Sequence, residues 1–474
     1  MSHSSNISKD FLPPYSKTEF PHRAQLIPKL WLGLSIATLL LAGFLSLSFI
    51  IGRAPVISEW ITDPLWIKRV LIVHVNLALI IFIYAFFCGL YLLIPNQTPR
   101  FRLQYVGFTL AVLATLTLVL TIFIPAATPI LTNYIPILDH PLFITSLLLF
   151  AVAVIFTISN SRLYQSKMNV VPQAPQIIPK VAVPALQSAA LLLVLSVITF
   201  SISWVYTDKN LIPFMYYELV IWGGGHILQF VNSATTVAAW LIISDKLLGE
   251  APVSYKQSRL LFVFFTFPVL FAPFLIIDGT SSALYLTGFT SYMRWGIFPV
   301  VSVFMIVIVW KLIRAKAKNT LPDSLFKNPY FTGLLVSLSF MLIGFVLGAL
   351  IRGSNTLIPA HYHATLGGIT VAFFTITYFL LDAFGKPFPS AKVKIWAAYQ
   401  SLIFGIGQLL FVFGFAYAGS YGLARKAFGS EQIIGSTEAL VGLAVAGFGG
   451  LLAILGGFIF LWVLLSSIKK APNS

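Results

Sequence analysis

The sequence contains a single cysteine, Cys88, and it falls within a strongly apolar segment. One cysteine excludes a disulfide within the chain and a Cys-x-x-Cys-His motif for covalent haem attachment. It also excludes a thiolate-bridged copper centre built from this chain alone. Any electrons that pass through the protein must therefore enter from another subunit, a soluble carrier or a quinol.

Charged residues are also scarce. They make up 9% of the chain, whereas 58% of the residues are hydrophobic and the mean hydropathy is +0.91. Such a composition indicates an integral membrane protein and excludes a soluble one. Because one crossing of a bilayer needs about 20 apolar residues, the sequence offers twelve candidate spans. They are predicted at 29–52, 67–95, 103–126, 136–160, 181–205, 214–244, 257–277, 291–314, 329–351, 358–384, 395–419 and 435–467.

The predicted fold class is therefore all-α, a polytopic membrane helix bundle with about twelve transmembrane helices. Spans and short loops take up nearly the whole chain, so we expect one membrane domain at 29–467. An N-terminal tail at 1–28 and a C-terminal tail at 468–474 flank it. The N-terminal tail carries charges and no apolar core, so we expect no cleaved signal peptide.

The net charge of +16 is distributed unevenly between the loops. Counted together with the span ends beside each loop, 22 of the 30 Lys and Arg residues lie on the side of the two tails and the loops after even-numbered spans, and 8 lie on the other side. Basic loops stay in the cytoplasm, so both termini are predicted to be cytoplasmic in the cell (inner) membrane. The charge thus reflects topology in a lipid bilayer, and we expect no nucleic-acid partner.

Histidine is scarce as well, with seven residues, yet His361 and His363 lie two residues apart near the start of the tenth span. On a helix, this spacing places the two rings on nearly opposite faces. An ionisable side chain inside a span is costly and is therefore a functional candidate. The two rings either line a polar transporter cavity or hold two haem irons on either side of one helix.

Two further histidines fall inside predicted spans. His74, in the second span, is either a satisfied core histidine or a ligand. His226, in the sixth, follows Trp222 across three consecutive glycines, which allow a backbone or a flat ligand to approach closely. The pattern indicates either a histidine presented to a bulky planar group or ordinary helix packing. Glu218, nearby, either handles protons or pairs with an arginine.

The other histidines, His3, His22 and His140, suggest no chemistry; His140 is predicted to cap the fourth span. A basic pair, Arg425 and Lys426, lies between spans eleven and twelve, on the side where positive charge is sparse. The pair is suited to bind carboxylates, because arginine can make two parallel hydrogen bonds to one. A solvated pair is the alternative.

Taken together, these motifs resemble subunit I of the haem–copper oxidases, the family of cytochrome c oxidases and related nitric oxide reductases. A histidine in the second span, Trp-x-x-x-His in the sixth, His-x-His in the tenth and a basic pair before the twelfth carry the resemblance. It implies that His74 and His363 are the axial ligands of a low-spin haem and that His361 is the proximal ligand of a high-spin haem. It also implies respiratory partner subunits, a cytochrome c or quinol donor, and O2 or NO as the acceptor.

The resemblance further implies that Arg425 and Lys426 bind haem propionates and that His226 is the first ligand of the copper B ion. Here the chain departs from the family pattern. The family completes the copper site with adjacent histidines in the seventh span, where this chain has Ser281 and Ser282. Serine is a poor copper ligand beside imidazole. We therefore expect two haems, no stoichiometric copper, and a pocket in which the two serines hydrogen-bond to water or ligand.

Phe230 stands where many oxidases have the tyrosine that is cross-linked to the span-six histidine. Asp278, Tyr285 and Glu218 are proton-path candidates, and His226 is a candidate distal donor. The leading hypothesis is that the chain is a two-haem oxidase-like subunit that reduces O2 or NO. One alternative is a copper-free dihaem electron-transfer cytochrome or gas sensor. Another is a twelve-span transporter without haem, although no paired broken spans indicate an inverted repeat.

We predict that both termini and the Lys311–Lys327 loop face the cytoplasm, because the basic residues concentrate there. A reporter that works only in the cytoplasm should be active when fused after Ser474. A fusion at the same point that is active only outside the membrane would contradict this topology.

Overall fold

A computed structural model describes residues 22–51, 65–96, 100–163, 176–322, 324–425 and 435–469. Within these residues, twelve helical segments are long and apolar enough to cross a membrane, which confirms the predicted all-α multi-pass bundle. The helices are α1 (His22–Ile51), α3 (Trp66–Asn76), α4 (Phe82–Leu92), α5 (Phe101–Leu120), α6 (Pro141–Ile158), α7 (Val183–Tyr206), α8 (Pro213–Leu248), α9 (Tyr255–Thr266), α10 (Ala283–Tyr292), α11 (Phe298–Ala317), α12 (Pro329–Leu350), α13 (Leu357–Ala383), α14 (Ala391–Ser420) and α15 (Thr437–Lys469).

Short irregular turns join some of these helices into single spans. A π-helical turn at Leu77–Ile81 connects α3 to α4, and another at Met293–Ile297 connects α10 to α11. A 3-10 segment at Pro268–Ile276 extends α9, where prolines interrupt the regular helix. Turns of the π type inside helices occur frequently at functional sites.

Two predicted span boundaries are wrong. The eighth span begins at Ala283, not at 291, because Ser282 caps α10 by accepting a hydrogen bond from Tyr285 N at 3.1 Å. The fourth span begins at Pro141, not at 136, because the preceding residues form a strand. His140 caps that helix with Nδ1 accepting from Leu142 N at 3.2 Å, as predicted.

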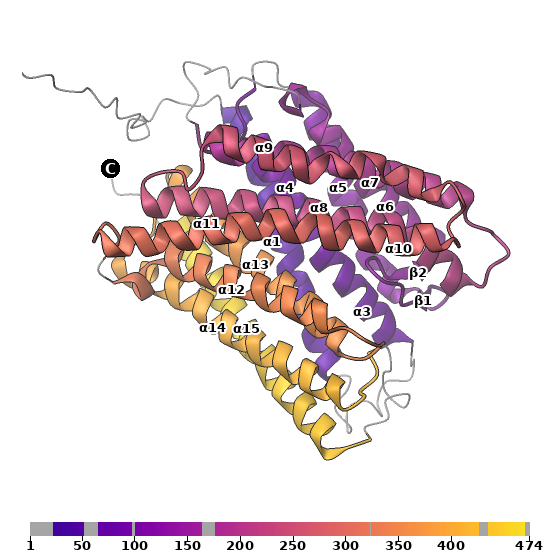
Figure 1. The fold of residues 1–474 in the computed structure, drawn as a ribbon. Coiled ribbons are helices and arrows are strands. Elements are labelled where there is room, and N and C mark those ends of the chain that lie inside the picture. Colours follow the sequence, from indigo (N-terminus) through magenta and orange to yellow (C-terminus); the bar gives the residue numbers. More distant parts are fainter. Residues whose placement is uncertain are drawn as a thin grey trace, which may run out of the picture.

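The only sheet among the described residues is a small hairpin between α5 and α6. Strand β1 (Thr128–Ile130) pairs antiparallel with β2 (Ile137–Asp139), and Pro129 lies opposite Leu138. Figure 1 shows the hairpin at the right-hand end of the bundle, close to α3 and α6, and these elements contact one another. The hairpin tip therefore reaches the membrane domain instead of projecting away from it.

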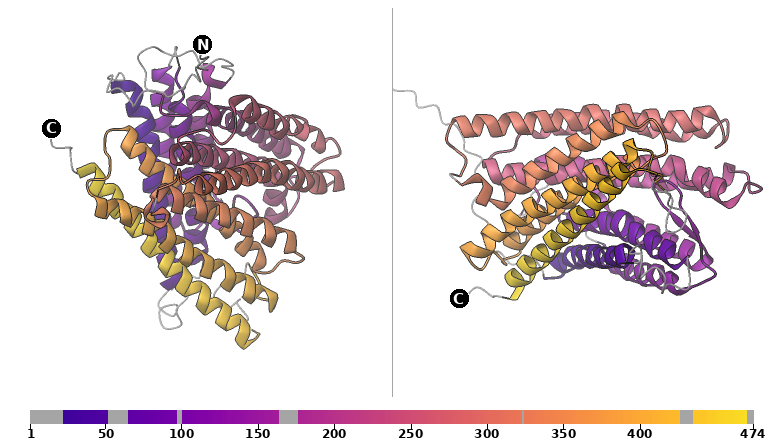
Figure 2. Two further views of the ribbon diagram at one scale, coloured as in Figure 1. Left: turned by 60° about the vertical axis from the view of Figure 1, so that its left-hand side comes forward. Right: turned by 90° about the horizontal axis from the view of Figure 1, so that it is seen from below.

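The helices α8 and α13 form the centre of the bundle. In their most apolar windows, 89% and 83% of the residues are buried, more than in any other described span. On the outside, α14 and α15 lie side by side along most of their length (Figure 2), where Gly407, Gly414 and Gly449 bring the two backbones together. Polar side chains on α8 and α13 must consequently find partners inside the protein.

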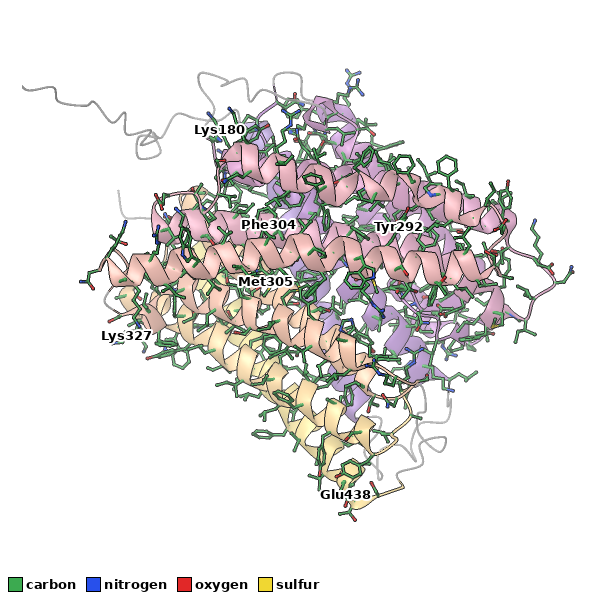
Figure 3. All side chains as sticks on the ribbon, in the orientation of Figure 1. Lys180, Tyr292, Phe304, Met305, Lys327 and Glu438 are labelled. Atoms are coloured by element: carbon green, nitrogen blue, oxygen red, sulfur yellow. The ribbon has the colours of Figure 1, made fainter. Side chains whose placement is uncertain are left out.

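The loops alternate between the two ends of the bundle, as successive crossings require. Figure 3 labels Lys180, just before α7, and Lys327, just before α12, at the same end. Glu438, at the start of α15, lies away from both. Both lysines belong to loops that the basic-residue pattern assigns to one side.

Candidate functional site

The two histidines of α13 point to different neighbours. His361 Nδ1 lies 2.7 Å from Gly344 O on α12, and Gly348 makes room for the ring, since a Cβ there would lie 2.8 Å from it. The ring of His363 instead lies 4.6 Å from that of Phe411 on α14. The two rings therefore leave the helix on opposite sides, as their spacing predicts.

The backbone of α13 is held on the side of His363. Gln408 Nε2 on α14 donates to His363 O at 2.9 Å, and Gly367 accommodates the Gln408 side chain. At the start of the helix, Asn355 Oδ1 accepts from Leu357 N at 3.0 Å and so caps the first turn. The position of His363 thus depends on side chains from two neighbouring segments.

His74 on α3 is the residue predicted to share the low-spin haem with His363. Its Nδ1 lies 2.7 Å from Ala42 O on α1. A π-helical turn begins three residues later, at Leu77. The contact with α1 fixes the ring of His74, and its pairing with His363 stays a prediction.

These histidines suit metal coordination. A backbone carbonyl can only accept, so the Nδ1 atoms of His74 and His361 carry the proton, and Nε2 keeps its lone pair. Histidine ligands commonly donate the second ring nitrogen to a carbonyl in this way, which fixes both tautomer and orientation. The donor set fits haem iron, for which neutral imidazole is an ordinary axial ligand.

Arg425 fits the anionic edge of such a cofactor. Its Nη2 donates to Asn133 Oδ1 at 2.9 Å, while its buried Nε has no hydrogen-bond partner. A buried guanidinium nitrogen without a partner is costly, and a carboxylate would satisfy it. Lys426, the other half of the predicted basic pair, lies outside the described residues.

Asn133 also binds Glu218, so that the asparagine joins Glu218 to Arg425. Asn133 N donates to Glu218 Oε2 at 2.9 Å, and Asn133 Nδ2 donates to Glu218 Oε1. Of the two roles considered for Glu218, these contacts favour the arginine-linked one. The carboxylate anchors the hairpin tip to the N-terminal end of α8.

His226 on α8 is almost fully buried, with 1% of its surface exposed. Its Nδ1 lies 2.7 Å from Trp222 O, one turn earlier in the same helix. Its Nε2 lies 2.9 Å from Tyr134 Oη and 3.5 Å from Thr290 Oγ1. Tyr134 comes from the β1–β2 hairpin, and its pKa is raised well above the ordinary value, first by burial and second by the Glu218 charge.

Sequence reasoning missed both Asn133 and Tyr134. No histidine, motif or helical period marks them. The available signal was the loop itself, which carries no charge between Phe123 and Asp139. An uncharged connection between two spans indicates a segment that folds back into the protein.

The three glycines before His226 admit the protein's own aromatic rings. A Cβ would lie 3.0 Å from Phe289 at Gly223, 2.4 Å from Phe200 at Gly224 and 2.7 Å from Tyr134 at Gly225. The interpretation that the run lets a flat ligand approach is therefore wrong, and helix packing, the alternative, is what the structure has.

The predicted serine-lined pocket is also wrong. Ser282 is occupied as the cap of α10, and its Oγ donates to Gly279 O at 2.8 Å. Thr290, the residue beside His226, follows eight residues later, which corresponds to about 12 Å along a helix. Ser281 directly precedes Ser282 and is exposed, so Thr290 supplies the hydroxyl near His226 that the two serines were expected to supply.

Tyr285, on α10, binds the backbone of α8 about one turn before His226. Its hydroxyl donates to Leu219 O at 2.7 Å, accepts from Gly223 N at 2.9 Å and lies 3.0 Å from Ser203 Oγ. Leu219 and Gly223 are four residues apart and so belong to one helical turn. The contacts of Tyr285 therefore hold α8 just before His226.

Among the described residues, no three His, Cys, Asp or Glu side chains lie close enough together to hold a metal ion between them. Asp278 is exposed. Phe230 packs against Phe265, with ring centroids 5.1 Å apart, and its ring faces Gly296.

A family profile described as "Cytochrome C and Quinol oxidase polypeptide I" matches residues 27–452. The chain belongs to the haem–copper oxidase subunit I family. An uncharacterized protein of Rickettsia prowazekii (strain Madrid E) is 25% identical to this chain over 499 aligned residues. The alignment covers 91% of this chain and 94% of that protein.

Another uncharacterized protein, of Aquifex aeolicus (strain VF5), is 27% identical over 377 residues, covering 79% of this chain and 89% of that protein. Membership of the subunit I family supports haem binding in general and a place among membrane-bound redox proteins. It leaves the number of haems and the acceptor to be argued from the residues.

Tyr285→Phe should lower the free energy of unfolding by about 1–3 kcal/mol, because two buried backbone groups lose the hydroxyl that bridges them. Denaturation of the purified protein in detergent measures the change. Tyr399→Phe, at an exposed tyrosine on α14, is the control and should leave stability unaltered. Equal stabilities for the two variants would show that the clamp on α8 is dispensable.

Proposed function

We propose that this chain is a respiratory subunit that binds one low-spin and one high-spin haem and transfers electrons to O2 or NO. The observation that carries the proposal is the placement of His361 and His363 on opposite sides of α13, each against a different helix. One helix can thereby separate two haem sites by the width of its own backbone. The haems would supply the redox chemistry, and the protein supplies their positions.

Each proposed ligand has a defined task. His74 and His363 would hold the low-spin haem as its two axial ligands, and His361 would hold the high-spin haem as its only protein ligand. The carbonyls of Ala42 and Gly344 keep the first and the last of these rings in the coordinating tautomer. Arg425 would pair with a propionate through its free Nε.

On the other side of the proposed high-spin site, His226 is the candidate distal residue. Its contacts with Tyr134 and Thr290 bring three polar groups together beside the rings of Phe289 and Trp222. Glu218 and Tyr285, proposed from the sequence as catalytic, have contacts that suit positioning roles: Glu218 anchors the hairpin tip and Tyr285 holds α8. Such packing also keeps bulk water away from the pocket.

Electron supply must come from outside the chain. Cys88 is buried and is the single cysteine of the sequence, so no thiolate centre of this chain can serve as the entry point. We therefore propose a companion respiratory subunit, a cytochrome c or a quinol as the donor. The proposed location is the cell membrane, with both termini in the cytoplasm.

A second candidate function is a dihaem electron-transfer cytochrome or gas sensor that does not reduce its ligand. The observation that favours it is the engagement of His226 Nε2 by Tyr134, which leaves this nitrogen bonded to a protein group. Turnover of O2 or NO with a chemically reduced donor separates the two functions. Sustained consumption supports the reductase, whereas ligand binding without consumption supports the cytochrome or sensor.

Replacement of either axial histidine should abolish the bis-imidazole signal of the low-spin haem. We expect His74→Ala and His363→Ala to lose the six-coordinate optical and electron paramagnetic resonance signals, because each removes one of two ligands. His361→Ala should retain that signal and lose the high-spin one. If His74→Ala keeps both signals, the assignment of His74 is wrong.

Elemental analysis of the purified protein should find iron for two haems and no stoichiometric copper. Among the described residues, His226 belongs to no group of three His, Cys, Asp or Glu side chains, and copper prefers several nitrogen ligands. One copper per two haems in the wild type, lost in His226→Ala, would contradict this expectation.

A further inference from the structure

The tip of the β1–β2 hairpin covers the Nε2 end of His226, and the sequence pattern marks no site residue in this segment. Tyr134 lies at this tip, and its ring centroid is 4.6 Å from that of His226. Its Oη lies 2.9 Å from His226 Nε2 and 3.9 Å from Met293 Sδ. The hairpin thus delivers one hydroxyl to the end of the imidazole that a metal or ligand would approach.

The backbone at Tyr134 is strained. Its φ is 62°, a value that side-chain-bearing residues rarely adopt, and Ile135 N donates to Asn133 O at 2.7 Å across it, as in a γ-turn. Such a conformation costs about 1–3 kcal/mol and persists only where other contacts enforce it. Here the bonds from Asn133 to Glu218 and Arg425 enforce it. The fold holds Tyr134 in the pocket against a local cost.

The direction of the hydrogen bond follows from the other ring nitrogen. His226 Nδ1 faces the carbonyl of Trp222, which only accepts, so Nδ1 carries the proton and Nε2 can only accept. Tyr134 therefore donates its hydroxyl hydrogen to Nε2. A hydroxyl that turns from Nε2 towards the pocket offers a donor to whatever binds there. This donor suits a small neutral acceptor and is unfavourable for a metal cation.

We propose that Tyr134 is a distal hydrogen-bond donor that binds a small neutral diatomic ligand, and that His226 holds its hydroxyl when no ligand is present. This inference rests on the proposed high-spin haem at His361. It adds a ligand-binding residue from the α5–α6 connection to the histidines of the spans. The neighbouring groups, Met293 and Phe289, are apolar or weakly polar, so Tyr134 and Thr290 determine the polarity of this end of the pocket.

The test compares the carbon monoxide complexes of the reduced full-length wild type and of Tyr134→Phe. A donor to the bound oxygen lowers the C–O stretching frequency and slows dissociation, so the variant should show a higher frequency and dissociation about fivefold faster, equivalent to ~1 kcal/mol. Tyr378→Phe is the matched control, because it removes a buried hydroxyl that binds Gln400 at 3.0 Å instead. The control should match the wild type.

A second variant displaces Tyr134 without altering it. In Gly225→Ala, the new methyl group would lie 2.7 Å from the Tyr134 ring and push it away, whereas Gly457→Ala, on α15, meets nothing within 4 Å. We expect Gly225→Ala to shift both readouts in the same direction as Tyr134→Phe, and Gly457→Ala to shift neither.

The outcomes distinguish a failure of the role of Tyr134 from a failure of the proposed haem-binding function. Haem-loaded Tyr134→Phe or Gly225→Ala with unaltered frequency and dissociation rate overturns the role of Tyr134 and leaves the haem sites intact. A wild type that carries no haem overturns the proposed function and this inference with it. If Tyr134→Phe does not accumulate in the membrane, Gly225→Ala alone decides.

Discussion

A hydrogen bond from histidine Nδ1 to a backbone carbonyl recurs at His74, His226 and His361, and the chemistry of the protein depends on it. Inside a membrane no water satisfies a polar ring, so the protein must do so. A carbonyl satisfies one nitrogen and at the same time determines the tautomer, which leaves the other nitrogen as an acceptor or ligand. Three separate helices supply these carbonyls: α1, α8 and α12. The positions of the rings therefore depend on the packing of the whole bundle.

The β1–β2 hairpin provides the second constraint, since it links parts of the chain that are distant in sequence. Asn133 binds Glu218 near the N-terminal end of α8 and Arg425 after α14, and the next residue, Tyr134, binds His226. These contacts come from adjacent residues of one tight turn, with Tyr134 at positive φ. Asn133 therefore supports Arg425, the candidate propionate-binding residue, and, through its neighbour Tyr134, also His226, the candidate distal residue.

Sequence reasoning predicted the features that follow from composition and period. Twelve spans follow from hydropathy, and the opposite faces of His361 and His363 follow from the helical repeat. It failed where tertiary contacts override local pattern. The polar residues around Tyr285 resemble a loop, yet Ser282 caps a helix there. The glycines before His226 resemble a ligand platform, yet aromatic rings from other segments fill the space. Tyr134 was missed because a turn with positive φ at a tyrosine has no sequence signature.

The pocket at His226 differs from a metal site in the kind of group that meets its free nitrogen. Thr290 and Tyr134 bring hydroxyls where additional imidazoles would be needed to hold copper, and hydroxyls are weak ligands for it. A phenol that donates to Nε2 also satisfies the lone pair that a metal would use. The contacts of Asn133 with Glu218 and Arg425 offset the strain at Tyr134 and hold this phenol against His226. Under the proposed function, a ligand bound at this position would therefore meet a hydrogen-bond donor.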